Sequence, residues 1–362
     1  MLTVLHGADF HLDSPFSELS PEQAKLRRQE ARQLLTRLQA LAVEKQADLV
    51  LLAGDILDSG TVYRETLEAM ETALGACPCP VLIAPGNHDP YTEHSPWAKL
   101  RLPDHVHIFR QNKPERVAFP SLGCVVYGAG FIGETQEESL LESFRAEDEG
   151  LLRLMVLHGD VTKGDSPYQP LRVEQIAATG LHYLALGHIH RTGGLQKAGE
   201  TYWAYAGCPE GRGFDETGEK GVLLLRLDGK TVTAELVPLA QRHYQLLTVD
   251  ITGQDALTAV QARLPQTAKQ DACRIVLTGE REGAPLDLLR LEEALRPLCW
   301  QIQLRDETRA AQELWEKAGE DSLRGLALQA LLQKRQTAQS GTEHSIDLAA
   351  QFLLAAMDGR EL

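Results

Sequence analysis

Residues 48–55 read DLVLLAGD, an apolar run that ends in glycine and aspartate. The same form, an apolar run followed by polar or histidine residues, occurs at TVLHGA (3–8) and at PVLIAPGNHD (80–89). Helical patterns separate the three runs: SPEQ at 20–23 is a capping box ahead of leucines at helical spacing, and a second pattern covers residues 65–74. This β, α, β, α, β order predicts an α/β fold, a sheet with helices on its faces.

Five further strand-like runs follow in the first two thirds of the chain. They are CVVYG (124–128), LRLMVLHGD (152–160), YLALGHIH (183–190), TYWAYAG (201–207) and GVLLLRLDG (221–229). Polar and histidine residues stand at the carboxyl ends of several of these runs. In open α/β sheets the strand ends project loops into one common crevice, and we expect the functional site there.

The pattern changes after about residue 242. The strand-like runs YQLLTVDI (244–251), CRIVLTGE (273–280) and WQIQLRD (300–306) alternate with helical stretches at 255–264 and 286–295, and from Glu307 onward the sequence reads as helix. We predict three parts: a main domain at 1–242, a small α/β capping domain at 243–306 and a C-terminal helical segment at 307–362.

Composition limits the class of protein. Of the 362 residues, 43% are hydrophobic and 24% are charged, which is typical of a globular chain and not of a disordered or collagenous one. The apolar runs are much shorter than the roughly 18 residues that span a bilayer. The start MLTVLHGADFHLDSP has no basic region followed by a long apolar stretch, so we expect a cytoplasmic protein without a membrane segment.

The charge balance restricts the way in which nucleic acid could bind. Lys and Arg total 36 against 51 Asp and Glu, a formal net charge of −15. A chain that neutralised phosphates over its whole surface would usually be basic. Any contact with nucleic acid must therefore be local, supplied by bound cations, or shared with a partner.

Seven side chains at the strand ends have the chemistry of metal ligands: Asp9, His11, Asp55, Asn87, His158, His188 and His190. In extended chain, residues i and i+2 point to the same side, so the pairs in ADFH and GHIH could each grip one ion or straddle two. Mixed Asp, Asn and His ligands without Cys suit Mn²⁺, Fe²⁺ or Zn²⁺ better than Mg²⁺ or Ca²⁺. Seven ligands are too many for one ion.

A two-metal site accounts for this number of ligands. Two ions about 3.5–4 Å apart can clamp a phosphate and activate a water between them. Asp55 is the natural bridging candidate because a carboxylate can reach both cations, and Gly54 lets the backbone turn sharply beside it. Phosphoester hydrolysis is the reaction that this chemistry suits best.

The order DxH, GD, GNHD, H, GHxH resembles the calcineurin-like metallophosphoesterase superfamily. The longer strings DFHLDSPF, GDILDSG and PEGRGFDETGEKG are similar to those of its SbcD/YhaO-type DNA-repair exonuclease branch. The resemblance covers about residues 1–240. It implies a four-layer αββα core and two bound divalent metal ions, most often Mn²⁺. It also implies hydrolysis of DNA phosphodiesters and an SMC-like ATPase partner of the SbcC/YhaN type. Whether the chain also forms a homodimer stays open.

The resemblance also implies roles for single residues. Asp9, His11, Asp55 and His190 would hold one ion, and Asp55, Asn87, His158 and His188 would hold the other. His88 would stand by the scissile phosphate, where it could stabilise the transition state or protonate the leaving oxygen. Asp58 matches the acidic residue that orients this histidine in many phosphoesterases, although some nucleases of the branch carry histidine there.

Several alternatives stay open from the sequence. The chain could be a phosphodiesterase or phosphatase for a nucleotide or small metabolite, which the acidic balance favours, or a non-catalytic scaffold that binds DNA ends. Arg212 and Lys220 could contact phosphate or lie in a solvated loop. The apolar stripes of the last helices, among them Leu323, Leu326 and Leu353, could fold back on the capping domain or bind the coiled-coil root of the ATPase.

Overall fold

The structure is a computed structural model, and it describes residues 1–147, 150–229, 231–281, 285–310, 315, 317–338 and 342–357. The described residues form two compact units. Unit 1 lies within 1–212 and 218–241, and unit 2 contains 213–217 and the described residues from Arg242 onward. The division into three domains with separate roles stays a prediction.

The first sheet of unit 1 has six strands in the order β14, β13, β1, β2, β3, β4. Its strands are β1 (Leu2–Gly7), β2 (Leu49–Leu52), β3 (Val81–Ile83), β4 (Val106–Ile108), β13 (Gly221–Asp228) and β14 (Thr231–Pro238). Strands β1 to β4 are parallel, and β13 runs antiparallel to β1, with Leu5 opposite Leu224. The parallel strands end at one edge of the sheet, where the polar residues of the sequence follow them.

The second sheet of unit 1 also has six strands, in the order β11, β12, β10, β7, β6, β5. They are β5 (Glu115–Phe119), β6 (Cys124–Gly128), β7 (Leu152–His158), β10 (Tyr183–Gly187), β11 (Gln196–Ala198) and β12 (Thr201–Tyr205). The four central strands are parallel, and both edge strands are antiparallel to their neighbours. A short pair, β8 (Asp160–Val161) and β9 (Pro170–Leu171), follows the end of β7.

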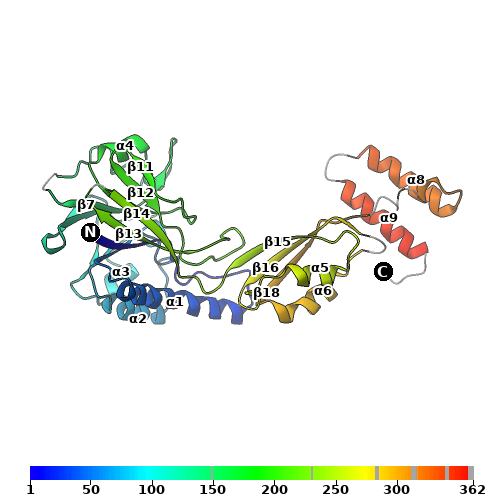
Figure 1. The fold of residues 1–362 in the computed structure, drawn as a ribbon, viewed down its shortest axis with the longest axis horizontal. Coiled ribbons are helices and arrows are strands. Elements are labelled where there is room, and N and C mark those ends of the chain that lie inside the picture. The colour runs from blue at the N-terminus through cyan, green and yellow to red at the C-terminus, as the bar shows by residue number, and fades with distance from the viewer. Residues whose placement is uncertain are drawn as a thin grey trace. The chain divides into compact units, whose positions relative to one another are not determined.

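The hydrophobic clusters of unit 1 show four layers. One cluster joins the first sheet to α1 (Pro21–Glu44), α2 (Arg64–Gly75) and α3 (Pro96–Lys99). A second joins the facing surfaces of the two sheets, and a third joins the second sheet to α4 (Val173–Ala178). Figure 1 shows α1 and α2 on one side of the unit 1 sheets and α4 on the other. The predicted αββα core is confirmed.

Helix α1 begins as its sequence predicts. The Ser20 side chain accepts a hydrogen bond from the Gln23 backbone, the Gln23 side chain accepts one from the Ser20 backbone, and Pro21 is the first helical residue. This capping box satisfies two N–H groups that the first turn would otherwise leave unpaired. The face with Leu34 and Leu38 is buried against the first sheet.

Unit 2 contains a smaller parallel sheet in the order β15, β16, β18. Its elements are β15 (Tyr244–Asp250), α5 (Ala256–Arg263), β16 (Ala272–Thr278), α6 (Leu288–Leu295) and β18 (Gln301–Asp306). Alternate residues of β16, Cys273, Ile275 and Leu277, lie in one core with residues of α5 and α6. The predicted β, α, β, α, β pattern after residue 242 is therefore present.

The remaining residues of unit 2 differ in part from the sequence prediction. Residues Arg309–Ala310 form a short strand, β19, that pairs with β17 (Glu280–Arg281), so helix does not begin at Glu307. Helix is present in α8 (Leu323–Gln336) and α9 (Glu343–Met357), and the expected break at 340–342 lies mostly outside the described residues. The strand forms because residues far back in the chain supply its hydrogen-bonding partner, which a local pattern cannot reveal. None of the described helices is both long and apolar enough to cross a membrane.

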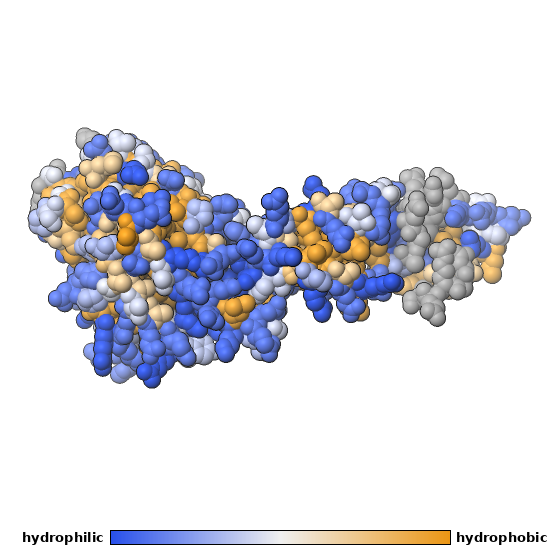
Figure 2. Space-filling view, turned by 60° about the horizontal axis from the view of Figure 1, so that its bottom comes forward, coloured by the Kyte–Doolittle hydropathy of each residue, from blue (hydrophilic) through white to orange (hydrophobic). Residues whose placement is uncertain are grey.

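Hydrophilic residues cover most of the face drawn in Figure 2, and hydrophobic residues form scattered patches on it. The remaining short helical turns are η1 (Pro120–Leu122), η2 (Arg296–Leu298) and η3 (Lys317–Gly319).

Candidate metal centre

The site residues predicted from the sequence lie at the carboxyl ends of parallel strands in unit 1. Asp9 and His11 follow β1, Asp55 follows β2, Asn87 and His88 follow β3, His158 is the last residue of β7, and His188 and His190 follow β10. Backbone hydrogen bonds join the loops after β1 and β2, since Asp9 N donates to Gly54 O and His11 N donates to Asp55 O. Because the two sheets pack face to face, strand ends of both sheets meet at this edge.

One group of ligand atoms comprises Asp9, His11 and His190, whose carboxylate oxygen and ring nitrogens lie within 4.8 Å of one another. The Nε2 atoms of His11 and His190 are 3.1 Å apart. His11 Nε2 is also 3.7 Å from Asp55 Oδ2. These four residues are the set that the resemblance assigns to one ion.

A neighbouring group comprises Asp9, Asp55 and His158. His158 Nε2 lies 3.3 Å from Asp55 Oδ2 and 3.0 Å from Asn87 Oδ1. The His188 ring lies 5.3 Å, centroid to centroid, from the His158 ring, and the His188 backbone donates to Asp9 Oδ1. Asp55 therefore lies between His11 and His158, which is the place that a bridging carboxylate needs. The assignment of each ligand to an ion stays a prediction.

His88 is exposed and forms a third group of candidate ligand atoms with His11 and Asp58. Its backbone N–H donates to Asp55 Oδ1 at 2.9 Å, and its ring centroid is 4.8 Å from that of His11. Its Nδ1 lies 3.0 Å from the backbone oxygen of Asp58. The Asp58 carboxylate instead contacts His11 Nδ1 at 3.1 Å and accepts the Ser14 hydroxyl at 2.7 Å. In this arrangement the Asp58 carboxylate orients His11, whereas its backbone oxygen reaches His88.

The backbone of the site is strained. Four predicted ligands have positive φ: Asp9 (54°), His11 (44°), Asp55 (51°) and His188 (109°). Non-glycine residues rarely adopt this region, and such strain clusters at functional sites because the surrounding structure holds it there. Gly54 has φ 84°, and a Cβ atom at this position would lie 2.4 Å from His158 Nδ1. The glycine therefore makes the sharp turn after β2 that the sequence predicts, and it also leaves room for the His158 ring.

The electrostatics of the site suit bound cations. Burial raises the pKa of the Asp9 carboxyl to about 6, against the attraction of His158. Burial also favours the neutral form of Asp55, but His158 beside it keeps the pKa of that carboxyl below its ordinary range. Burial lowers the pKa of His11 to about 4 and that of His188 to about 4, so both rings are neutral at pH 7 and have a nitrogen lone pair to offer. Buried carboxylates beside neutral imidazoles form a donor set that fits divalent cations.

His158 differs from His11 and His188. Burial would lower its pKa, but the Asp55 carboxylate raises it to about 9. The His158 ring is therefore protonated, and its positive charge offsets the buried carboxylates of Asp9 and Asp55. A divalent cation would supply that charge instead, and the ring would then lose its extra proton and offer a nitrogen lone pair. This residue also fits the donor set.

Asp89 is a buried residue of the site that is not among the residues predicted from the sequence. Its carboxylate accepts backbone N–H groups of Gly86, Asp55, Ile56 and Leu57 at 2.7 to 3.2 Å. It thereby fixes the turn that carries Asp55. In the sequence, this role is indicated only by the position of Asp89 as the last residue of GNHD, directly after Asn87 and His88.

Arg212 and Lys220 do not lie in a solvated loop. Arg212 Nη1 donates to Asp58 Oδ1 at 3.1 Å, and its Nη2 is 3.1 Å from His190 Nδ1. Lys220 is buried, and its Nζ donates to the His190 backbone oxygen at 3.0 Å. Both basic side chains therefore contact the predicted ligand His190.

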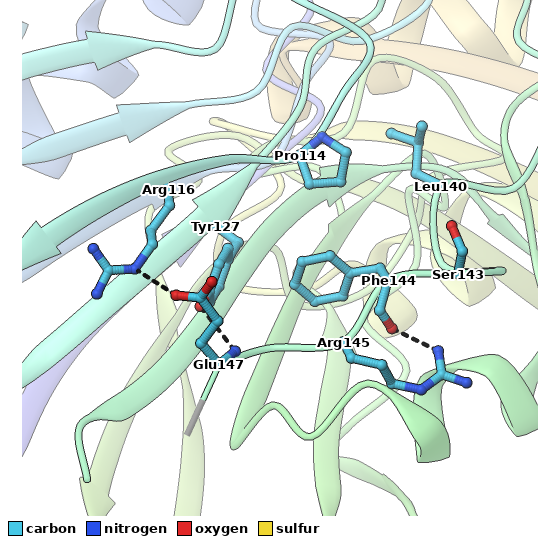
Figure 3. A pocket seen from close by; sticks show the side chains of 8 residues that line it. All are labelled: Pro114, Arg116, Tyr127, Leu140, Ser143, Phe144, Arg145 and Glu147. Carbon is cyan, nitrogen blue, oxygen red and sulfur yellow. Dashed lines mark hydrogen bonds and ion pairs between the residues drawn. The ribbon is translucent and has the colours of Figure 1, made fainter. Parts of the chain in front are cut away.

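A separate hollow of about 440 Å³ lies beside β5 and β6 and contains none of the predicted site residues. Tyr127, Phe144 and Arg145 are among its lining side chains (Figure 3). Arg116 lies 3.8 Å from Glu147 across it, so its positive charge is partly offset.

Comparison with known proteins agrees with this geometry. The family model described as calcineurin-like phosphoesterase matches residues 2–192. The chain is 29% identical over 337 residues to the uncharacterized metallophosphoesterase YhaO of Bacillus subtilis (strain 168), an alignment that covers 85% of this chain and 82% of YhaO. It is 24% identical over 262 residues to SbcD of the nuclease SbcCD from the same organism, covering 60% of this chain and 64% of SbcD.

Among solved structures, a dimetal phosphatase from Danio rerio matches with a TM-score of 0.42 and 14% identity, covering 63% of this chain and 93% of the phosphatase. The family model spans more than half of the chain, and the predicted ligands fall within its range. The chain belongs to the calcineurin-like phosphoesterase family, and it is a metallophosphoesterase.

Proposed function

We propose that this chain is the nuclease component of a DNA end-processing complex, which hydrolyses DNA phosphodiesters with two divalent ions, preferably Mn²⁺. The observation that carries the proposal is the convergence of Asp, Asn and His side chains from both sheets on one edge of unit 1, in a chain similar to SbcD of the nuclease SbcCD. When bound, the two ions would polarise the phosphorus ester and lower the pKa of an attacking water.

The side chains have separate roles in this proposal. Asp9, His11, Asp55 and His190 hold one ion, and Asp55, Asn87, His158 and His188 hold the other. His88 is exposed and 2.9 Å from Asp55 through its backbone, so its ring can reach a substrate oxygen. There it protonates the leaving oxygen or stabilises the transition state.

An ATPase partner of the SMC-like type is part of the proposal, and the charge of the chain supports it. The net charge of −15 leaves most of the DNA-binding surface to another molecule. Helices α8 and α9 expose apolar side chains, with Leu323 at 76% exposure and Leu326 and Phe352 also exposed. Large exposed apolar side chains on adjacent helices are typical of a protein interface. We assign this surface to the ATPase.

A second candidate function is a phosphodiesterase for a nucleotide or a small metabolite. The same net charge of −15 favours it, because a small substrate needs no extended basic surface. It predicts fast turnover of small esters without any gain from DNA or from an ATPase.

The test compares two substrates. The purified protein is incubated with Mn²⁺ and end-labelled linear duplex DNA, and in parallel with bis-p-nitrophenyl phosphate, with EDTA as the metal-free control. The nuclease proposal expects Mn²⁺-dependent cleavage of both. Turnover of the small ester with intact DNA, also after addition of the ATPase, would favour the second function.

His88→Asn tests the mechanism. We expect its rate to fall at least about 10²-fold, with unchanged Mn²⁺ affinity, because a general acid contributes about that factor. His94→Asn is the matched control, since His94 is also exposed and lies outside the groups of candidate ligands. An unchanged rate for His88→Asn would remove this residue from the mechanism.

A further inference from the structure

Arg212 is an arginine whose guanidinium contacts both Asp58 and the predicted ligand His190. Its Nη1 donates to Asp58 Oδ1 at 3.1 Å and to Ser14 Oγ at 3.3 Å, and its Nη2 lies 3.1 Å from His190 Nδ1. A guanidinium stays charged and can only donate hydrogen bonds. The side chain is 23% exposed, so it is held by the site and also reaches solvent.

The loop that carries Arg212 is fixed from behind by a buried ion pair. Glu210 Oε2 accepts Arg27 Nη1 at 2.7 Å, and Arg27 Nη2 donates to the Gly211 oxygen at 2.9 Å. Glu210 Oε1 accepts the Gln241 backbone at 2.7 Å. Arg27 and Glu210 have side-chain exposures of only 1% and 2%. The backbone just before Arg212 is thus tied to α1, and the guanidinium is preorganised rather than free to swing.

Arg212 and His88 flank the same residue. Arg212 contacts the Asp58 carboxylate, and His88 Nδ1 contacts the Asp58 backbone oxygen at 3.0 Å. Both the exposed imidazole and the guanidinium therefore lie next to Asp58, which itself contacts the predicted ligand His11. Planar guanidinium groups match phosphate oxygens in charge and geometry.

We propose that Arg212 is a substrate-binding residue that donates to a non-bridging oxygen of the phosphate, and that Glu210 and Arg27 are positioning residues for it. The inference rests on the phosphoester chemistry within the proposed function and does not require that DNA is the substrate. It adds a fixed cation of the chain itself to the charge that bound ions supply.

A purely structural role for Arg212 makes a different prediction. If the guanidinium only neutralised Asp58, its loss would act through the hydrogen bond between Asp58 and His11 and would change metal binding. Removal of both charges, in Arg212→Gln with Asp58→Asn, would then restore the site. A substrate-binding role predicts that phosphate binding is lost in the single variant and stays lost in the double variant.

The experiment measures binding of inorganic phosphate to the full chain loaded with stoichiometric Mn²⁺, by isothermal titration calorimetry, and binding of Mn²⁺ alone. For Arg212→Gln we expect the phosphate Kd to rise at least about tenfold, the range for loss of a hydrogen bond to a charged group. Mn²⁺ affinity should change by less than about threefold. Arg212→Lys should recover part of the phosphate affinity. Arg64→Gln, a change of an arginine that is 88% exposed on α2, should leave every value unchanged.

Kinetics with bis-p-nitrophenyl phosphate give a second readout. For Arg212→Gln, kcat/KM should fall by about 10- to 100-fold, with the pH profile preserved. Glu210→Ala should show a smaller fall, and combining it with Arg212→Gln should cause no further loss, because Glu210 acts through Arg212.

Three results would overturn the inference: an unchanged phosphate Kd in Arg212→Gln, a loss of Mn²⁺ affinity as large as the loss of phosphate affinity, or recovery of phosphate affinity in the double variant with Asp58→Asn. Failure of the proposed function is a separate result. It would appear as intact DNA in the nuclease assay, while the phosphate-binding measurements on Arg212 would remain valid.

Discussion

His6 and His11 lie on the same short stretch of chain and are both buried, but their hydrogen-bonding partners differ. His6 lies between the two sheets, with Nδ1 2.9 Å from the Tyr183 hydroxyl and Nε2 3.2 Å from the Leu186 oxygen. His11 faces the predicted ligands, with Nδ1 on Asp58. Burial lowers the pKa of both rings, so both are neutral at pH 7, but His11 has its other ring nitrogen directed at the candidate ligand His190.

The His6 environment predicts a pH dependence of stability. Burial lowers the pKa of His6 to about 3 from its ordinary 6.5. Below pH 6.5 the unfolded chain takes up a proton that the folded chain refuses, so this residue reduces stability as the pH falls from 6.5 towards 3, by up to about 1.4 kcal/mol for each pH unit. Above pH 6.5 its effect is constant.

The measurement is urea unfolding in EDTA at pH 7.5, 6.5, 5.5 and 5.0. We expect the free energy of unfolding of the natural chain to fall more steeply than that of His6→Gln, which has no imidazole to titrate. His94→Gln, at an exposed position, should follow the natural chain. Parallel curves for the natural chain and His6→Gln would show that His6 is not buried in its neutral form.

At the scale of elements, α1 does more than cover the first sheet. Its residue Arg27 forms a 2.7 Å ion pair with Glu210, on the loop before Arg212, and a second with Glu30. The guanidinium also lies 5.3 Å from the Phe16 ring centroid. A helix near the start of the chain thus fixes a loop more than 180 residues later.

Two Arg–Glu pairs of equal length in this chain allow a matched comparison. Arg27–Glu210 is buried and Arg64–Glu68 is exposed, and both have N–O distances of 2.7 Å. Glu210→Ala should lower the free energy of unfolding by about 3–5 kcal/mol, because it leaves Arg27 buried with less compensation. Glu68→Ala should lower it by about 0.5 kcal/mol or less. Chemical denaturation followed by circular dichroism measures both changes in the free energy of unfolding. Equal decreases would show that burial does not determine how much these ion pairs contribute to stability.

At the scale of the whole molecule, the two units have separate hydrophobic cores. The three clusters of unit 1 contain residues up to Leu239, and the cluster of unit 2 contains residues 247–304. Residues 213–217 also belong to unit 2. The centroid of the Phe214 ring lies 5.1 Å from that of the Tyr244 ring, and Arg274 Cζ lies 4.1 Å from the Phe214 centroid. This segment comes directly after Arg212.

Separate cores predict that unit 1 folds without unit 2. A chain of residues 1–241, with Phe214→Ser to remove the side chain that unit 2 covers, should retain hydrolysis of bis-p-nitrophenyl phosphate within about tenfold, because the predicted ligands all lie in unit 1. Its preference among DNA substrates should change if residues 243–306 restrict the DNA that reaches the site. Folding is checked by circular dichroism. Loss of both activities in a folded truncation would contradict the capping role.

The order of amino acids alone predicts the long buried strands, the first helices and the candidate ligands. Apolar runs such as DLVLLAGD form buried strands because their period and length leave few alternatives, and the residues directly after them are brought to one edge by parallel pairing. The capping box at Ser20 is equally local. For these features, the information lies within a few residues of the position that it specifies.

Packing over long distances sets how remote segments combine. The contacts of Arg212 with Asp58 and His190, the pair of Arg27 with Glu210, and the pairing of β19 with β17 all depend on how separate elements pack. So does the direction of the Asp58 carboxylate, which faces His11. Side chains as far apart in the chain as Asp58 and Arg212 meet after two sheets and a helix have packed together, and no local pattern records that geometry.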